Sequence, residues 1–167
     1  MKGYSFNPDI LRDKYKQERD KRLREDGNNQ YQEVSGDFSY FVDDPYINEE
    51  IERQALTDSY EIVIIGGGFG GVLAASRLKE AGFSDFKIIE KGGNFGGTWY
   101  WNRYPGASCD IESYIYFPLL EETKFIPGKK YTNAPETLEY FDVISEKFGL
   151  NEHAIFQTEV NDVRWKD

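Results

Sequence analysis

The glycine-rich stretch at residues 66–71 constrains the fold of this chain more than any other feature. It reads GGGFGG and places Gly66, Gly68 and Gly71 in the pattern G-x-G-x-x-G. The four residues before it are all β-branched. After it, apolar side chains recur at helical spacing up to Gly82, and glycine is typical of a helix C-terminus. The sequence therefore predicts a strand at 62–65, a tight turn and a helix.

A second strand is expected at residues 86–90, after a short loop. Both strands are apolar at consecutive positions, which is typical of parallel strands that helices cover on both faces. We therefore expect the beginning of a Rossmann-like α/β domain with a parallel sheet and helices, a fold that binds dinucleotides at its first glycine turn.

Each glycine of the pattern has a mechanical task in such a turn. Gly66 allows the tight turn, Gly68 lets the backbone approach a pyrophosphate, and Gly71 lets the helix pack closely on the strand. The first N–H groups of the helix, at the positive end of its dipole, would then face the phosphates. The alternative is a glycine-rich turn that binds nothing.

Glu90 ends the second strand, roughly 20 residues beyond the glycine turn. A carboxylate at this place accepts hydrogen bonds from ribose hydroxyls and repels a 2′-phosphate. The pattern favours an unphosphorylated adenosine, as in NAD or FAD, and it leaves open which of the two is bound. The alternative is an ordinary surface glutamate.

The stretch GGNFGGTWYWNRYPGASCDIES, residues 92–113, follows the second strand. A packed core does not need so many aromatic residues in a turn-rich segment, whereas a flat ring with polar edges does. Gly96 and Gly97 can bring bare backbone close to such a ring, and the aromatic side chains can wall it. Possible hydrogen-bond donors are Thr98, Asn102 and Arg103. The stretch thus favours a flavin.

Together, GGGFGG, Glu90 and GGTWYWNRYPGASCDIESYIY resemble the N-terminal part of the Baeyer–Villiger monooxygenases, a family of class B flavin-containing monooxygenases. The resemblance continues through YTNAPETLEYFDVISEKFGL. It implies an FAD-binding domain, NADPH as the reductant of the flavin, and insertion of an oxygen atom from O2 into a ketone to give an ester or lactone.

The resemblance also implies roles for individual residues. Gly66, Gly68 and Gly71 would cradle the FAD pyrophosphate, Glu90 would hold its ribose, and the backbone of Val160 would meet the adenine. Asp110 would lie near the flavin as the candidate catalytic residue. The remaining implied contacts are Gly97, Thr98, Trp99, Trp101 and Tyr116 at the flavin, and Ser108 and Cys109 with Asp110 beside the nicotinamide.

Some of these residues have simpler interpretations. Asp110 could cap a helix formed by residues 111–116. Cys109 could be a small buried side chain, and a nucleophilic role for it is disfavoured. His153 lies far from the motifs and is expected in a surface loop.

The chain is expected to divide near residue 58. Residues 1–57 would form a charged, mostly helical N-terminal extension, with one helix at 8–26 carrying pairs such as Glu18 with Arg22 and a short helix at 49–56. Residues 58–167 would form the N-terminal part of the FAD/NAD(P)-binding domain. Within it, a helix is expected between Pro135 and Gly149, with a core face of Leu138, Phe141, Ile144 and Phe148.

Composition narrows the function further. The net charge of −10 argues against nucleic acid and anionic membranes as partners. One cysteine, one histidine and no apolar leader argue against disulfides, a metal site and secretion, so a cytoplasmic protein is expected.

The resemblance covers only part of a family member. The family's second glycine fingerprint and its catalytic arginine are not found, so we expect an incomplete domain, a fragment that binds FAD at most. The rival hypotheses are a non-catalytic FAD-binding or interaction module, a domain that binds NAD alone, and another class B monooxygenase that oxygenates nitrogen or sulfur. The oligomeric state is left open.

Overall fold

The computed structural model describes residues 6–31 and 34–166. The chain divides into two compact units, one ending at Asp43 and the other spanning Asp44–Asp167. The division thus falls before residue 58, because residues 44–57 belong with the larger unit.

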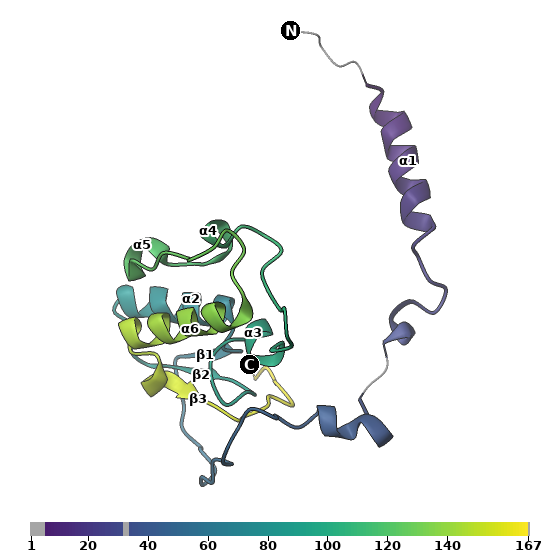
Figure 1. The fold of residues 1–167 in the computed structure, drawn as a ribbon. Coiled ribbons are helices and arrows are strands. Elements are labelled where there is room, and N and C mark those ends of the chain that lie inside the picture. Colours follow the sequence, from purple (N-terminus) through teal and green to yellow (C-terminus); the bar gives the residue numbers. More distant parts are fainter. Residues whose placement is uncertain (1–5, 32–33, 167) are drawn as a thin grey trace. The chain divides into compact units, whose positions relative to one another are not determined.

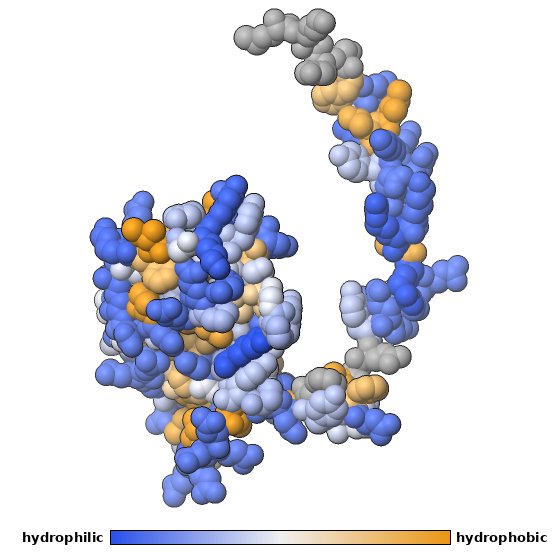
Figure 2. All heavy atoms as spheres, viewed as in Figure 1, coloured by the Kyte–Doolittle hydropathy of each residue, from blue (hydrophilic) through white to orange (hydrophobic). Residues whose placement is uncertain are grey.

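The smaller unit contains α1 (Pro8–Asp20) and two 3-10 helices, η1 (Gly27–Gln30) and η2 (Gly36–Phe41). Asn7 caps α1 by accepting the N–H of Asp9 at 2.9 Å. The helix buries no residue, and its surface in Figure 2 is largely hydrophilic. It ends six residues earlier than expected, since the next segment turns and forms a local ion pair between Arg24 and Asp26 at 2.5 Å. The expected pair of Glu18 with Arg22 is present at 3.8 Å.

The larger unit is built on a parallel sheet, as the sequence predicted, and a third strand that the sequence analysis did not include completes it. Its strands β1 (Ile62–Ile65), β2 (Phe86–Ile89) and β3 (Ala154–Ile155) are ordered β1-β2-β3, with β2 in the middle. Helix α2 (Phe69–Glu80) joins β1 to β2 and completes a strand–turn–helix–strand unit. The bounds of β1 agree with the prediction, and β2 ends one residue earlier, so Glu90 lies just beyond it.

The core lies between this sheet and two helices that Figure 1 shows on one side of it. Helix α2 packs on β1 and β2, and α6 (Ala134–Phe148) packs on α2. Phe69 of α2 stacks on Phe141 of α6 with ring centroids 4.2 Å apart. The expected core face of α6 is confirmed, with Phe141 and Ile144 buried and Leu138 and Phe148 half-buried.

Helices do not cover the opposite face of the sheet in the described part of the chain, so the expectation of cover on both faces was wrong. Val63 is 48% exposed and Ile65 60% exposed. Residues 51–60 run beside this face without regular secondary structure, and the helix expected at 49–56 is absent. Long-range bonds take its place: the N–H of Ile51 donates to Gln157 Oε1 at 2.8 Å, and the Arg53 guanidinium donates to Phe156 O at 3.1 Å.

Short helices lie between β2 and α6, and one more lies between α6 and β3. They are α3 (Thr98–Trp101), α4 (Ser113–Tyr116), α5 (Leu120–Thr123) and the 3-10 helix η3 (Asn151–His153). His153 is a packing residue rather than a surface loop residue, because its ring stacks on Phe86 at 4.1 Å and its Nδ1 lies 3.1 Å from Phe86 O. Among the described residues, no helix combines the length and the apolar character that a membrane crossing requires.

Candidate cofactor site

The glycine turn between β1 and α2 has the geometry that its sequence predicts. Gly66 has a φ of +96°, a left-handed value that side chains disfavour, and its N–H donates to Ile89 O at 2.8 Å. A Cβ on Gly71 would lie 1.9 Å from Gly66 O, so only glycine lets α2 approach the strand this closely. Gly68 is the N-cap of α2 and provides no side-chain cap, which leaves the first N–H groups of the helix available to an anion.

Glu90 is buried beneath this turn, with 5% of its surface exposed. Its Oε2 accepts the N–H of Gly67 at 2.5 Å, and its Oε1 accepts the N–H of Gly92 at 2.6 Å. A carboxylate has about four acceptor positions, so it can still accept from further hydroxyl groups. The side chain therefore holds two loops together, a role that the sequence did not indicate.

The aromatic stretch starts in direct contact with the glycine turn. A Cβ on Gly97 would lie 2.7 Å from the Cα of Gly68, and Gly97 has a φ of +51°. The N–H of Gly96 donates to the carbonyl oxygen of Gly67 at 3.0 Å. Two glycine segments far apart in sequence thus pack backbone against backbone, and α3 begins at their junction.

A cavity of about 360 Å³ opens beside α3 and brings together six of the predicted site residues. The indole N–H of Trp99 donates to Tyr116 Oη at 3.1 Å, so two aromatic rings are fixed at its wall. Asp110 is exposed and lies at the same cavity. The six residues are Thr98, Trp99, Ser108, Cys109, Asp110 and Tyr116. The cavity offers an aromatic wall, a carboxylate and hydroxyl groups within one space.

Two other predicted contacts lie outside this cavity. Trp101 packs edge-on against Tyr100 with ring centroids 5.0 Å apart. Val160 is half-buried and follows Thr158, whose N–H donates to Glu90 O at 2.9 Å. The end of the chain thus passes beside the glutamate.

Two of the three possible donors are engaged within the protein. Asn102 Nδ2 donates to Thr98 O at 2.8 Å, and Arg103 Nε donates to Tyr100 O at 2.9 Å. These bonds to nearby backbone acceptors fix both side chains to α3. Each bond uses only one N–H group, so both side chains keep further donors, and Asn102 also lines the cavity.

Buried hydroxyl groups hold the segment that carries Asp110, and no sequence motif indicated them. Ser113 Oγ lies 2.9 Å from Thr132 Oγ1, which lies 3.2 Å from Thr137 Oγ1. Cys109 is 4% exposed, and its N–H donates to Thr132 O at 2.8 Å, as expected for a small buried side chain. Asp110 does not cap α4, whose N-cap is Glu112 without a side-chain bond.

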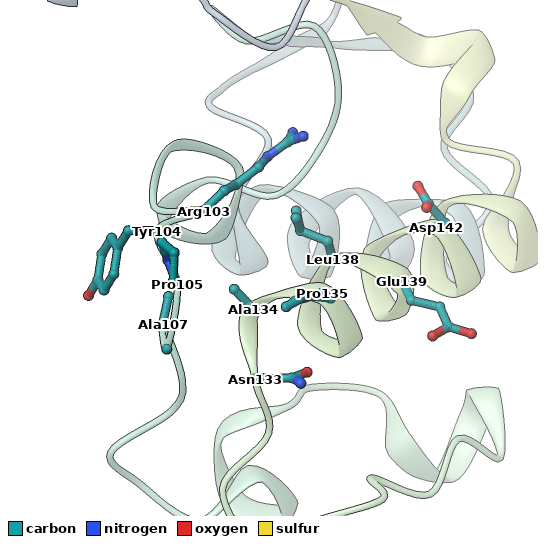
Figure 3. Close-up of a pocket in the computed structure, with 11 residues that line it drawn as sticks. Arg103, Tyr104, Pro105, Ala107, Asn133, Ala134, Pro135, Leu138, Glu139 and Asp142 are labelled. Atoms are coloured by element: carbon teal, nitrogen blue, oxygen red, sulfur yellow. The ribbon is translucent and has the colours of Figure 1, made fainter.

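A second and larger cavity, of about 620 Å³, is lined by Arg103, one of the three possible donors, and by no other predicted site residue. Figure 3 shows its two walls, the loop at residues 103–107 and the first turns of α6, with Leu138 between them. Among the described residues, no group of three or more His, Cys, Asp and Glu side chains could hold a metal ion.

Comparisons with known proteins agree with this geometry. The model of the NAD(P)-binding Rossmann-like domain matches residues 64–126. The chain is 45% identical over 163 residues to Baeyer–Villiger monooxygenase ATR8 of Stachybotrys chlorohalonatus, covering 97% of this chain and 26% of that protein. It is 45% identical to the pentalenolactone D synthase of Streptomyces arenae, covering 95% of this chain and 26% of the synthase.

Solved structures give the same result. A polycyclic ketone monooxygenase from Thermothelomyces thermophila matches with a TM-score of 0.78 and 38% identity over 94% of this chain and 27% of its own. A structure of OTEMO in complex with FAD and NADP matches with a TM-score of 0.61 and 31% identity over 67% of this chain and 22% of OTEMO. The chain spans about a quarter of the length of the curated relatives it matches. In sequence and in fold, this chain therefore matches the N-terminal quarter of Baeyer–Villiger monooxygenases.

Proposed function

We propose that this chain is the FAD-binding portion of a monooxygenase that uses NADPH and O2 to insert oxygen into a ketone. One observation carries the proposal: the backbone contact between Gly68 and Gly97 joins a glycine turn suited to a pyrophosphate to a cavity with an aromatic wall. One elongated ligand with a phosphate middle and a flat ring at one end fits both parts. FAD has this shape.

The residues present fit such a ligand. The uncapped start of α2 would face the pyrophosphate, with Gly66, Gly68 and Gly71 leaving room for it. Glu90 would accept from the ribose while keeping its bonds to Gly67 and Gly92. At the other end, Trp99 and Tyr116 would bound the flavin.

Asp110 is proposed as the catalytic carboxylate of the whole protein. When bound, the flavin would supply the redox chemistry with oxygen, and NADPH would reduce it. The exposed Asp110, with Ser108 beside it, would lie where the nicotinamide meets the flavin, and could orient the nicotinamide amide by hydrogen bonding. A ketone and O2 as partners, and a cytoplasmic location, belong to the same proposal.

Calorimetric titration of the 167-residue chain tests the part of the proposal that this chain carries. We expect FAD to bind more tightly than FMN or NAD, because each of these lacks one half of the contacts. ADP-ribose should bind more tightly than its 2′-phosphorylated form, since Glu90 repels the 2′-phosphate. Equal affinity for FMN and FAD, or no binding of FAD by the folded chain, would overturn the proposal.

A further inference from the structure

Residues 44–53, here called the strap, contact the aromatic stretch at Gly93, Tyr100 and Arg103. Asp44 forms a tight local turn, with its Oδ1 accepting the N–H of Tyr46 at 2.9 Å. Its Oδ2 accepts the hydroxyl of Tyr100 at 2.6 Å and the N–H of Gly93 at 3.1 Å. One carboxylate thus joins the strap, α3 and the loop after β2.

Tyr100 is the residue through which this carboxylate reaches α3. Its side chain is 2% exposed, and its hydroxyl both donates to Asp44 and accepts the N–H of Gly93 at 2.8 Å. A Cβ on Gly92 would lie 2.8 Å from the Tyr100 ring, so the ring lies directly on the loop backbone. Trp99, which lines the cavity, is the residue before Tyr100 in the same short helix.

Arg103 fixes the other end of this helix to the strap. Its guanidinium lies over the ring of Tyr46 at 4.0 Å and over the ring of Tyr100 at 4.5 Å. Its Nε donates to Tyr100 O at 2.9 Å. Arg103 therefore holds the ring of Tyr100, and Asp44 holds its hydroxyl group.

The contacts continue from the strap to the glycine turn. Gly93 bonds to Asp44, its neighbour Gly92 donates to Glu90 at 2.6 Å, and Glu90 accepts from Gly67 in the turn at 2.5 Å. The path of contacts from Asp44 to Glu90 thus passes through only two residues, Gly93 and Gly92. A change at Asp44 can alter both halves of the site without touching a ligand.

We propose that Asp44 is a positioning residue, which acts through Tyr100 to hold α3 and the loop at 92–97 in the orientation that a flavin requires. The strap then belongs to the cofactor site, because it supplies the carboxylate that positions α3. The consequence for the flavin rests on the proposed function, whereas the consequence for α3 does not.

Two substitutions and a matched control test the proposal in the full chain. Asp44→Ala removes the carboxylate, Asp44→Asn keeps its size without the charge, and Asp43→Ala removes the exposed carboxylate next to it. Far-ultraviolet circular dichroism reports whether each variant folds. If Asp44→Ala does not fold, Asp44→Asn carries the test.

The first measurement does not involve a cofactor. Amide hydrogen exchange of Gly93 should accelerate at least tenfold in Asp44→Ala, and less in Asp44→Asn, because Gly93 loses an acceptor and the ordered Tyr100 hydroxyl. The pKa of Tyr100, followed by NMR of ring-labelled tyrosine with Tyr100→Phe to assign the signal, should fall toward its ordinary value in both variants. Asp43→Ala should change neither. Unchanged exchange and an unchanged Tyr100 titration in folded Asp44 variants would overturn the proposal.

The second measurement concerns the flavin. The dissociation constant for FAD should rise about tenfold in Asp44→Ala, as for loss of a charged hydrogen bond, and stay unchanged in Asp43→Ala. Tyr100→Phe should weaken FAD binding similarly. The double variant Asp44→Ala/Tyr100→Phe should bind FAD only slightly more weakly than either single variant. Additive effects would contradict a path through Tyr100. If the unaltered chain fails to bind FAD while Gly93 exchange responds as expected, the proposed function fails and the positioning of α3 by Asp44 stands.

Discussion

The carbonyl oxygen of Gly66 lies 1.9 Å from the point that a Cβ on Gly71 would occupy. The nearest atom belongs to the backbone, so no flexible side chain can move aside to make room for the Cβ. We expect Gly71→Ala to lower the free energy of unfolding by at least about 2 kcal/mol, as forced overpacking does. Urea denaturation measures the change.

Gly70 provides a matched control in the first turn of the same helix, because a Cβ there would meet nothing within 4 Å. Gly70→Ala should be neutral or stabilising by up to about 1 kcal/mol, since alanine loses less conformational entropy in a helix. Equal losses in the two variants would contradict the close approach of α2 to the turn.

The two faces of the sheet should differ in their tolerance of truncation. Ile88 is fully buried under α2, whereas Ile65 is 60% exposed on the other face. Ile88→Ala should lower the free energy of unfolding by about 2–5 kcal/mol. Ile65→Ala should cost less than about 1 kcal/mol, because little apolar area leaves the interior. Similar losses at the two positions would mean that the second face is covered in solution.

Glu90 should contribute to stability before any ligand binds. Glu90→Gln leaves one of two backbone N–H groups facing an amide donor, so we expect a loss of about 1–3 kcal/mol in the free energy of unfolding. The variant should also bind ADP-ribose and its 2′-phosphorylated form with similar affinity. Glu159→Gln is the control, since Glu159 forms an exposed ion pair with Lys91 and should change stability by less than about 1 kcal/mol. A fully stable Glu90→Gln would contradict the two backbone bonds.

Tyr100 should make stability depend on alkaline pH. Burial, followed by the hydrogen bond to Asp44, raises the pKa of Tyr100 from 10.0 to about 12. The folded chain then holds this proton where the unfolded chain has lost it, so the contribution is complete below pH 10 and is lost as the pH rises toward 12. The difference in unfolding free energy between the unaltered chain and Tyr100→Phe should therefore shrink over this range. A difference independent of pH would contradict the buried contact.

Local sequence signals predicted the centre of the fold well. The β-branched run, the glycines and the Pro135 and Gly149 limits of α6 each specify backbone geometry within a few residues, and the observed bounds agree within one residue. Where distant contacts compete with local propensity, the predictions were wrong. The segment 49–56 is rich in helix-forming residues, yet its backbone and side chains bond to residues 156–158.

The candidate site divides in the same way. The family resemblance implied roles for the cavity residues Trp99 and Asp110, and motif spacing predicted Gly66 and Gly71, because each signal lies within a short stretch of the chain. It did not predict that Gly97 touches Gly68 or that Thr132 supports Cys109, since these pairs meet only after folding. Asp44 was missed for that reason, as it lies in a segment with no motif of its own.

The central claim is that the glycine turn and the Trp99 cavity hold one FAD molecule together. Heteronuclear NMR of the 167-residue chain titrated with FAD tests it most directly. We expect the backbone amides of residues 67–71 and the indole N–H of Trp99 to shift together and to saturate at one FAD per chain. Shifts confined to the cavity around Leu138, or a folded chain whose spectrum does not change, would contradict the account.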